Sequence, residues 1–328
     1  MLAVYATSFD PLDPLAHVAV GDLEPGKTPE DWVTVRVQAA AINHHDLWTL
    51  RGPAPAGGLP MILGTDAAGI TEDGRNVIVH NVLANPDAGH GDDTCDPDRH
   101  IISERVPGTL AEQVRVPARN LVDKPPQLSW THAACLPTAW LTAYRMLTTK
   151  GHAAPGETVL IQGAAGGVAT AALLMGKAMG LRVWVTSRDA DKRRWAQGLG
   201  ADAAFEPGQP LPTPVDLVIE TVGAATWQHS VDSVRYGGRI VVSGITSGPM
   251  PPADLRSILA KVITIHGSVV GTAAELARLA DFLTLSGVRP VIDRVLPLSK
   301  AVEGIAAMKQ GNVRGKIVAV PDAVLAGA

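Results

Sequence analysis

A glycine-rich turn stands where an apolar segment gives way to a stretch typical of a helix. The run Thr158-Val159-Leu160-Ile161 favours a short strand, and Gln162 and a Gly-Ala-Ala-Gly-Gly sequence follow it. Glycine allows a tight turn and a close backbone approach to a pyrophosphate, which the free N–H groups of a helix N-terminus bind. The pattern predicts a dinucleotide site, and a strand–helix turn that simply needs glycine is the alternative. We expect the cofactor to contact Gly163, Ala165, Gly166, Gly167 and Val168.

The next expected strand ends at a hydroxyl that is followed by cations. Ser187 comes directly after the segment Arg182–Thr186, where the NAD-binding form of such a site carries an acidic residue for the ribose. A hydroxyl with Arg188 and Lys192 suits a 2′-phosphate, which a carboxylate would repel. NADPH is therefore favoured over NADH. Two alternatives stay open, namely that Ser187 caps a helix with a solvated basic face, and that Asp189 serves the ribose instead.

Alternating strand and helix patterns surround these motifs. An alanine-rich helical stretch covers Ser129 to Thr149, and further helices are expected after the glycine turn, through Met179, and then up to Leu199. Further apolar strands are expected at Asp216–Glu220, Arg239–Val242 and Val262–Ile265. Near-continuous apolar strands that alternate with helices indicate a parallel sheet covered on both faces. The sequence thus predicts an α/β protein with a doubly wound nucleotide-binding domain over residues 125–266.

The two ends of the chain have a different texture. Residues 1–124 are rich in short β-type segments such as Trp32–Val37 and Asn76–Val79, and residues 85–107 form a polar stretch expected on the surface. After residue 266 the pattern continues with a helix, a strand, a helix and a strand, at Ala273–Leu285, Val291–Leu296, Lys300–Lys309 and Lys316–Val320. We expect residues 267–328 to return and complete the first domain.

Composition narrows the class of partner. The 328 residues carry a formal net charge of −4, which offers no basic field for nucleic acid or an anionic membrane. The two cysteines, Cys95 and Cys135, are too few for a disulfide scaffold or a four-cysteine zinc site. Met1–Pro14 lacks the pattern of a secretory signal, and no apolar run reaches membrane-spanning length. We therefore expect a cytoplasmic protein that acts on a small molecule, without nucleic-acid or membrane partners.

Several further motifs carry a family resemblance over essentially the whole chain. They are Ala41-Ile42-Asn43-His44-His45-Asp46-Leu47, Leu63-Gly64-Thr65-Asp66-Ala67-Ala68-Gly69, Gly108-Thr109-Leu110-Ala111-Glu112, Leu141-Thr142-Ala143-Tyr144, Gly198-Leu199-Gly200-Ala201-Asp202, Val222-Gly223, Gly237-Gly238-Arg239 and Gly315-Lys316-Ile317-Val318. With them the chain resembles a medium-chain dehydrogenase/reductase, in the branch that includes quinone oxidoreductases and zinc-type alcohol dehydrogenases. The resemblance implies a GroES-like catalytic domain, a Rossmann domain and an active site in the cleft.

The resemblance also implies a test for zinc. Zinc-dependent members carry a cysteine where Asn43 stands, a histidine at Thr65, a carboxylate at Asp66 and a further ligand near Thr138. Amide and hydroxyl groups are poor Zn²⁺ ligands, so we expect no zinc in this site, nor in the 85–107 lobe, which keeps Cys95 alone. Neighbouring side chains of an extended segment point to opposite faces, which argues against a replacement site built from His44 and His45.

The resemblance places the remaining candidate residues. Asn43 and Thr142 would face the nicotinamide, whose groove would be lined by Val222, Gly223, Gly244 and Ile245. His45 stands where related alcohol dehydrogenases carry a proton-relay hydroxyl, and histidine titrates near neutral pH. A half-buried histidine bonded to a neighbour is the alternative. Asp46 is a structural carboxylate or, with a raised pKa, a proton source.

Together these features predict an NADPH-dependent oxidoreductase that transfers hydride without zinc to a quinone, an enone or another carbonyl-type acceptor. A zinc-type alcohol dehydrogenase with an unconventional metal site and a dinucleotide-binding protein with little catalysis are the alternatives. The apolar strand expected at Val262–Ile265 lies at a sheet edge, which pairing with a second subunit would protect. A homodimer is therefore expected.

Overall fold

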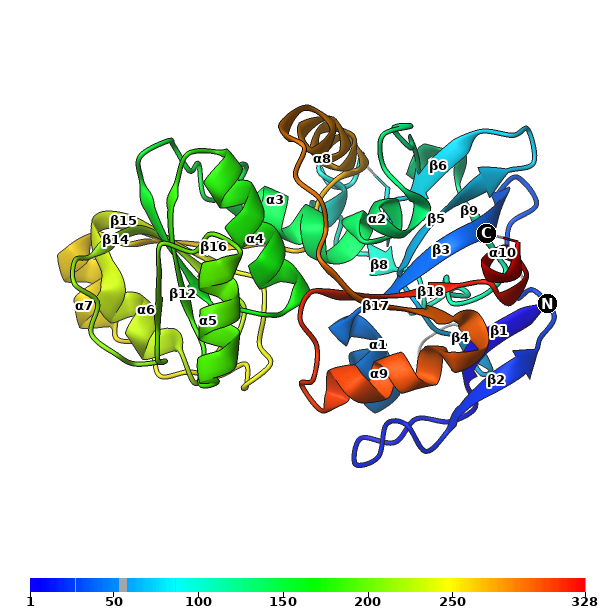
Figure 1. The fold of residues 1–328 in the computed structure, drawn as a ribbon, viewed down its shortest axis with the longest axis horizontal. Helices are drawn as coiled ribbons and strands as arrows, with labels where there is room; N and C mark the ends of the chain where they lie inside the picture. The colour runs from blue at the N-terminus through cyan, green and yellow to red at the C-terminus, as the bar shows by residue number, and fades with distance from the viewer. Residues whose placement is uncertain (27, 53–57, 86, 328) are drawn as a thin grey trace. The chain divides into compact units, whose positions relative to one another are not determined.

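The computed structural model describes residues 1–26, 28–52, 58–85 and 87–327. Contacts along its backbone divide the chain into two compact units, Met1–Leu141 with Val270–Ala328, and Thr142–Val269. Within the described residues no helix has the length and apolar character that a membrane span requires. Each unit has its own sheet system (Figure 1).

The first unit is built on mainly antiparallel sheets, in which β17 and β18 form a parallel pair. Its largest sheet has the strand order β10 (Leu121–Asp123), β6 (Asn76–Val79), β5 (Asp66–Thr71), β3 (Val33–Ile42), β18 (Lys316–Val320) and β17 (Ile292–Pro297), with β9 (Gln113–Val116) also paired to β3. A second sheet has the order β2 (Val18–Asp22), β1 (Leu2–Ala6), β4 (Met61–Ile62), and β7 (Val82–Leu83) pairs with β8 (His100–Ile101). The antiparallel pairing of β18 with β3 joins the C-terminal segment to the N-terminal part of the chain.

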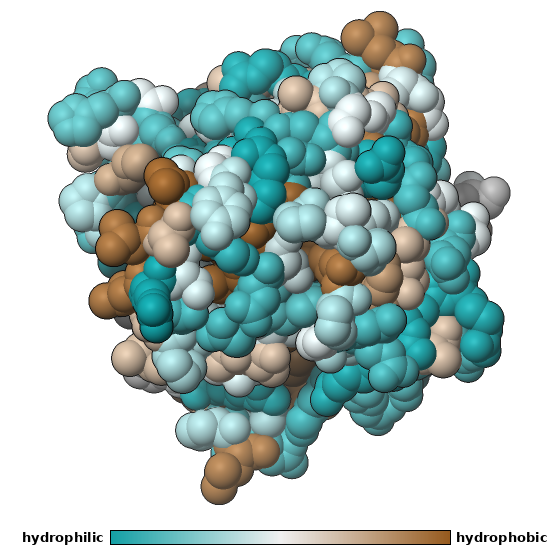
Figure 2. Space-filling model, turned by 90° about the vertical axis from the view of Figure 1, so that its left-hand side faces the viewer, coloured by the Kyte–Doolittle hydropathy of each residue, from teal (hydrophilic) through white to brown (hydrophobic). Residues whose placement is uncertain are grey.

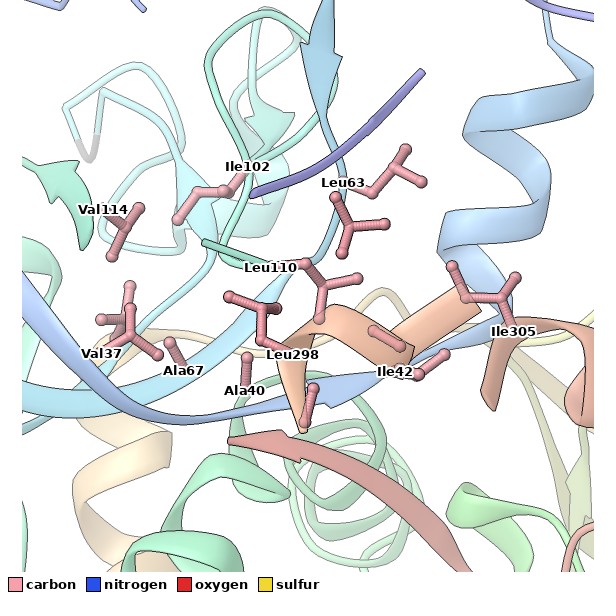
Figure 3. Packing of buried hydrophobic residues seen from close by; sticks show 14 of the residues in the cluster. Val37, Ala40, Ile42, Leu63, Ala67, Ile102, Leu110, Val114, Leu298 and Ile305 are labelled. Carbon is pink, nitrogen blue, oxygen red and sulfur yellow. The ribbon is translucent and has the colours of Figure 1, made fainter. Parts of the chain in front are cut away.

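Helices pack against these sheets, and buried apolar side chains between them form the main core of the unit. The α-helices of the first unit are α1 (His44–Arg51), α2 (Trp130–Ala134), α8 (Ala273–Ser286), α9 (Ala301–Lys309) and α10 (Asp322–Ala326), with shorter turns η1 (Asp93–Cys95), η2 (Ala118–Asn120), η3 (Leu136–Trp140) and η4 (Leu298–Lys300). Figure 3 shows part of the core, in which Val37, Leu110 and Ile305 belong to one buried cluster although they are distant in sequence. Burial of this apolar surface is what holds the two ends of the chain together.

The second unit is a six-stranded parallel sheet. Its strands stand in the order β13 (Ala203–Phe205), β12 (Arg182–Thr186), β11 (Thr158–Gln162), β14 (Val215–Glu220), β15 (Val234–Val242) and β16 (Thr264–Gly267). Its helices are α3 (Leu141–Leu147), α4 (Gly167–Ala178), α5 (Ala190–Gly198), α6 (Trp227–Ser233) and α7 (Leu255–Lys261). The first residue of α3, Leu141, is the last residue of the first unit before the boundary at Thr142. In Figure 1, α4 and α5 lie on one face of this sheet and α6 and α7 on the other. The predicted doubly wound sheet and β-rich GroES-like part are confirmed.

Three details differ from the sequence-based expectations. Val262 is not part of a strand, because helix α7 continues to Lys261 and Val262 ends it in the left-handed conformation (φ 52°). His44 and His45 lie on helix α1 and not in an extended segment. Adjacent residues of a helix do not share a face either, so the argument against a zinc site built from His44 and His45 still holds. Residues 125–141 make their contacts with the first unit, because α2 packs on β3 and β5, although the predicted nucleotide-binding domain began at residue 125.

Candidate active site

Helix α1 begins directly after strand β3, and its first turn is fastened by a buried carboxylate. Asn43, the residue before the helix, is extended (φ −132°, ψ 159°), and its backbone N–H donates to Asp46 Oδ2 at 2.8 Å. Oδ1 of Asp46 accepts the backbone N–H of Gly64 at 2.9 Å. Burial raises the pKa of the Asp46 carboxyl, and these hydrogen bonds oppose that rise. Because backbone groups occupy both oxygens, Asp46 positions the start of α1.

The side chain of Asn43 leads into a set of hydrogen bonds among buried polar groups and the half-buried Thr138. Asn43 Nδ2 donates to Thr65 Oγ1 at 3.0 Å, which lies 2.9 Å from Thr138 Oγ1. Thr138 Oγ1 in turn donates to Asp66 Oδ1 at 2.5 Å and accepts from Asn81 Nδ2 at 2.6 Å. Thr138 reaches this place from η3, a π-helical turn. Such turns arise where the regular helical ladder is interrupted, as Pro137 interrupts it here.

Lys316, from strand β18, inserts a charge into this set. Its Nζ donates to the backbone oxygen of Ile42 at 2.9 Å and to Asn43 Oδ1, and lies 3.5 Å from Asp66 Oδ2. The Lys316 and Asp66 side chains are 3% and 0% exposed. A buried ion pair holds only when hydrogen bonds satisfy the remaining groups, as they do here. We call Asn43, Thr65, Asp66, Asn81, Thr138 and Lys316 the Asp66 network.

The Asp66 network contains the positions that the family resemblance associates with zinc, and its chemistry does not fit that ion. Three of these positions supply an amide or a hydroxyl, which are weak Zn²⁺ ligands, and the one carboxylate already faces the Lys316 ammonium. The thiol of Cys135 donates to the backbone oxygen of Thr131 at 3.2 Å, and burial raises its pKa to about 12. Among the residues that the structure describes, no three His, Cys, Asp or Glu side chains are grouped so that they could hold a metal.

His45 is held by two neighbours on either side of its ring. Its Nε2 lies 2.9 Å from Glu104 Oε1, and its Nδ1 lies 3.4 Å from Thr49 Oγ1. The second oxygen of Glu104 accepts the backbone N–H of Ile101 at 2.7 Å. Burial raises the pKa of the Glu104 carboxyl, but the hydrogen bonds from His45 and Ile101 outweigh it and leave the pKa below its ordinary value. The imidazole ring is thereby fixed in orientation between a carboxylate and a hydroxyl.

The glycine turn of the second unit has the geometry of an anion site. Gly163 is in the left-handed region (φ 112°), and Gly166 is the residue before helix α4, with no side chain capping the helix. A Cβ placed at Gly166 would meet no atom within 4 Å, so the backbone there is open to approach. The first N–H groups of α4, beginning at Gly167, thus have no side-chain acceptor at the cap and can bind a phosphate.

The end of strand β12 carries the residues expected at the ribose. Asp189 caps helix α5, since its Oδ1 accepts the backbone N–H groups of Asp191 and Lys192 at 2.7 and 3.2 Å. Ser187 Oγ accepts the backbone N–H of Asp189 at 3.2 Å. Arg188 is exposed. The carboxylate of Asp189 therefore has a structural role as the cap of α5.

Two loops that follow neighbouring strands lie against each other at the other end of the predicted cofactor groove. Val222 O accepts hydrogen bonds from Ser247 N and Ser247 Oγ, both at 2.8 Å. A Cβ on Gly244 would lie 2.1 Å from Thr221 O, and one on Gly223 (φ 95°) 2.6 Å from Gly248 O. Only glycine permits this approach. Ile245, by contrast, is half-exposed and free to contact a ligand.

The predicted residues fall into two sets. Asn43, His45 and Asp46 lie together at the start of α1 in the first unit, whereas buried Thr142 belongs to the second unit with the cofactor residues. Sequence reasoning missed the roles of Lys316, Glu104, Gln162 and Glu220. Lys316 stood in a family motif, but its contact with Asn43 joins residues 273 apart in sequence.

Comparison with known proteins identifies the family of the chain. The family models "Alcohol dehydrogenase GroES-like domain" and "Zinc-binding dehydrogenase" match residues 29–126 and 167–284. The 2-methylene-furan-3-one reductase of Solanum lycopersicum is 30% identical, in an alignment that covers 96% of this chain and 76% of that protein. The acryloyl-coenzyme A reductase of Sulfurisphaera tokodaii is 29% identical, covering 92% and 95%.

A solved structure described as an NAD-dependent alcohol dehydrogenase superposes with a TM-score of 0.87 at 30% identity, covering 98% of this chain and 99% of that one. The chain belongs to the medium-chain dehydrogenase/reductase superfamily. It is therefore an NAD(P)-dependent oxidoreductase with a GroES-like part and a Rossmann-type sheet.

The buried pair predicts a specific pattern of stability. Asp66→Asn leaves the Lys316 ammonium buried without a counter-charge and should lower the free energy of unfolding by about 3–5 kcal/mol. In the double variant Asp66→Asn/Lys316→Met no charge remains, so the loss should be smaller than for Asp66→Asn alone. Urea unfolding measures both. Asp123→Asn, at the exposed Arg75 pair, is the control and should change stability by less than about 1 kcal/mol. Equal losses in the single and double variants would contradict the paired role.

Proposed function

We propose that this protein is a zinc-independent reductase that transfers hydride from NADPH to an electron-poor, carbonyl-conjugated acceptor. The observation that carries the proposal is the Asp66 network, in which the Asp66 carboxylate is paired with the Lys316 ammonium and hydrogen-bonded to Thr138 where a metal would need ligands. Without a Lewis acid, an acceptor must already be electrophilic. Enones, enoyl thioesters and quinones meet that condition, and two relatives named as reductases of conjugated acceptors support the choice.

In the proposed reaction NADPH supplies the hydride, and the chain's own residues orient the acceptor and deliver one proton. With an enone or enoyl thioester, hydride would add to the β-carbon and a proton to the α-carbon, giving the saturated carbonyl compound and NADP⁺. A quinone would take up the hydride and one proton to give the hydroquinone. His45 is the proposed proton donor, because Glu104 and Thr49 fix its ring. Asn43 and Thr142 would orient the nicotinamide, and Asp46 would keep Asn43 in place through its backbone bond.

The cofactor preference rests on charge at the adenosine end. Asp189 caps α5 through its Oδ1, which gives it a role within the helix, and Ser187, Arg188 and Lys192 would receive a 2′-phosphate. The pyrophosphate would lie on the turn of Gly163, Ala165, Gly166, Gly167 and Val168, and the nicotinamide beside Val222, Gly223, Gly244 and Ile245. The proposed functional domains remain residues 1–124 with 267–328 and residues 125–266, in a cytoplasmic protein.

A turnover panel tests the proposed function. The purified protein should oxidise NADPH in the presence of enones, enoyl thioesters or 1,4-quinones, and much more slowly with simple aldehydes and ketones. Tight cofactor binding without turnover on any acceptor would favour a dinucleotide-binding protein. Turnover confined to alcohols and aldehydes would favour an alcohol dehydrogenase. Either result would overturn the proposal.

Metal analysis gives a second, independent prediction. Protein purified without chelators should contain far less than one zinc per chain, since the donor set of the Asp66 network does not suit that ion. Turnover should also survive prolonged treatment with a chelator. One zinc per chain, lost together with activity on chelation, would contradict the metal-free site.

Cofactor choice has its own test. Lys192→Ala should weaken NADPH binding about tenfold or more and leave NADH binding nearly unchanged, because it removes a cation that would face only the 2′-phosphate. Cofactor dissociation constants from fluorescence titration measure the difference. Lys300→Ala, an exposed lysine of the first unit, is the control. Equal losses for the two cofactors would rule out a phosphate contact.

The proposal includes a homodimer formed through the edge of the parallel sheet. In the part of the chain that the structure describes, strand β16 pairs only with β15, and the adjoining apolar side chains Leu255, Leu259 and Val262 are 71%, 80% and 72% exposed. Figure 2 shows apolar side chains gathered on one side of the polar surface. A second copy that pairs along β16 would satisfy the open edge and cover these side chains at once.

A single charge introduced into the proposed interface should disrupt the dimer. Light scattering of the wild-type protein should give the mass of two chains, and Leu259→Glu should shift it towards one chain because a carboxylate would be buried in the interface. Leu285→Glu, on the exposed face of α8, is the matched control and should leave the mass unchanged. A wild-type mass of one chain would refute the dimer.

A further inference from the structure

The second unit contains a second buried polar network, at the carboxyl ends of three parallel strands. Strand β11 is buried along its length and ends in a glutamine, Gln162, although apolar residues occupy the positions before it. By strand register Gln162 stands beside Glu220, the last residue of β14. Both side chains are inaccessible to solvent. Polar groups in such a place are costly unless every donor and acceptor is satisfied, so their bonds indicate what they hold.

The side-chain amide of Gln162 accepts a hydrogen bond on one side and donates hydrogen bonds on the other. Its Oε1 accepts from Thr186 Oγ1 at 2.8 Å, and Thr186 Oγ1 accepts the backbone N–H of Gly163 at 3.2 Å. On the other side, Gln162 Nε2 donates to Ser230 Oγ at 3.0 Å and to His229 Nδ1 at 3.1 Å. The carbonyl oxygen and both N–H bonds of the amide are therefore used, which fixes the orientation of the side chain.

The chain of bonds continues to the second loop. Ser230 Oγ donates to Glu220 Oε2 at 2.6 Å. Glu220 Oε1 accepts the backbone N–H groups of Val222 and Gly223 at 2.8 and 3.0 Å. Thr226 Oγ1 also donates to Glu220, at 2.9 Å to Oε1. An unbroken series of hydrogen bonds thus joins the amide of Gly163 to the amides of Val222 and Gly223.

We propose that the series Gly163–Thr186–Gln162–Ser230–Glu220 is a brace that sets the distance between the loop at the cofactor's pyrophosphate and the loop at its nicotinamide. The inference rests on the proposed function, which puts the pyrophosphate at the Gly163 turn and the nicotinamide beside Val222–Gly223. Ligands of parallel sheets bind at the carboxyl ends of the strands, where this brace lies. Hydride transfer tolerates little misplacement of the nicotinamide, so a fixed span favours the reaction. Gln162, Ser230 and Glu220 are positioning residues, because they act through these loops.

The test breaks the brace at Ser230, whose side chain is the smallest of those that form it. Ser230→Ala removes the hydroxyl between Gln162 and Glu220 and adds little strain, and Ser233→Ala, on the same helix α6 and also buried, is the matched control. Gln162→Met is a second break, with Gln228→Met on the exposed side of α6 as its control. Variants that keep the wild-type melting temperature are compared by cofactor binding and by hydrogen–deuterium exchange.

Breaking the brace should weaken the binding of whole NADPH much more than the binding of a fragment that lacks the nicotinamide. Ser230→Ala should weaken NADPH about tenfold and leave the fragment adenosine 2′,5′-bisphosphate within about twofold, because the fragment reaches only one end of the brace. Exchange at Val222 and Gly223 should accelerate in Ser230→Ala and not in Ser233→Ala. Equal weakening of both ligands, or unchanged exchange at those amides, would overturn the brace. If the wild-type protein bound neither ligand, the proposed function would fail, and the exchange measurement would still decide whether the brace exists.

Discussion

The buried contact of Lys316 with Asp66 and Asn43 is the interaction on which the first unit depends. It joins β18, β3 and β5, and so binds the last strand of the chain to the segment that begins α1. A lysine ammonium in such a place must be neutralised and fully bonded. That requirement consumes the carboxylate and amide groups at the position where relatives of the zinc-dependent kind bind metal. The contacts that hold the buried lysine are therefore the same contacts on which the proposal of a metal-free site rests.

The second unit follows a different constraint, which is the alignment of parallel strand ends. β11, β12 and β14 end side by side, so one edge of the sheet collects Gly163, Thr186 and Glu220. The glycines there allow two loops to approach each other within van der Waals distance, and the buried amide of Gln162 connects the two sides. The result is a closely packed arrangement of the two loops at the carboxyl end of the sheet, where the cofactor site is proposed. Such preorganisation is the protein's contribution to chemistry that the cofactor supplies.

Local features of the sequence predicted the second unit well. The Gly163 turn, the strand Arg182–Thr186 and the alternation of strand and helix depend on neighbouring residues, and the sheet is as expected. Helix α1 was missed, because Asp46 stabilises it through Gly64, a contact made only after β3 and β5 pair. The pairing of Glu104 with His45 likewise spans 59 residues. Val262 looks like a strand residue by type, but the preceding helix determines its backbone.

The central claim is that hydride passes from the nicotinamide to a conjugated acceptor without a metal. The most direct measurement uses NADPH deuterated at the transferable C4 position and chelator-treated protein, with an enone as acceptor. Mass spectrometry and NMR of the product then locate the label. Deuterium at the β-carbon of the saturated ketone, at an unchanged rate after chelation, is the result we predict. Deuterium at the carbonyl carbon of an alcohol product, or loss of transfer that zinc restores, would contradict the account.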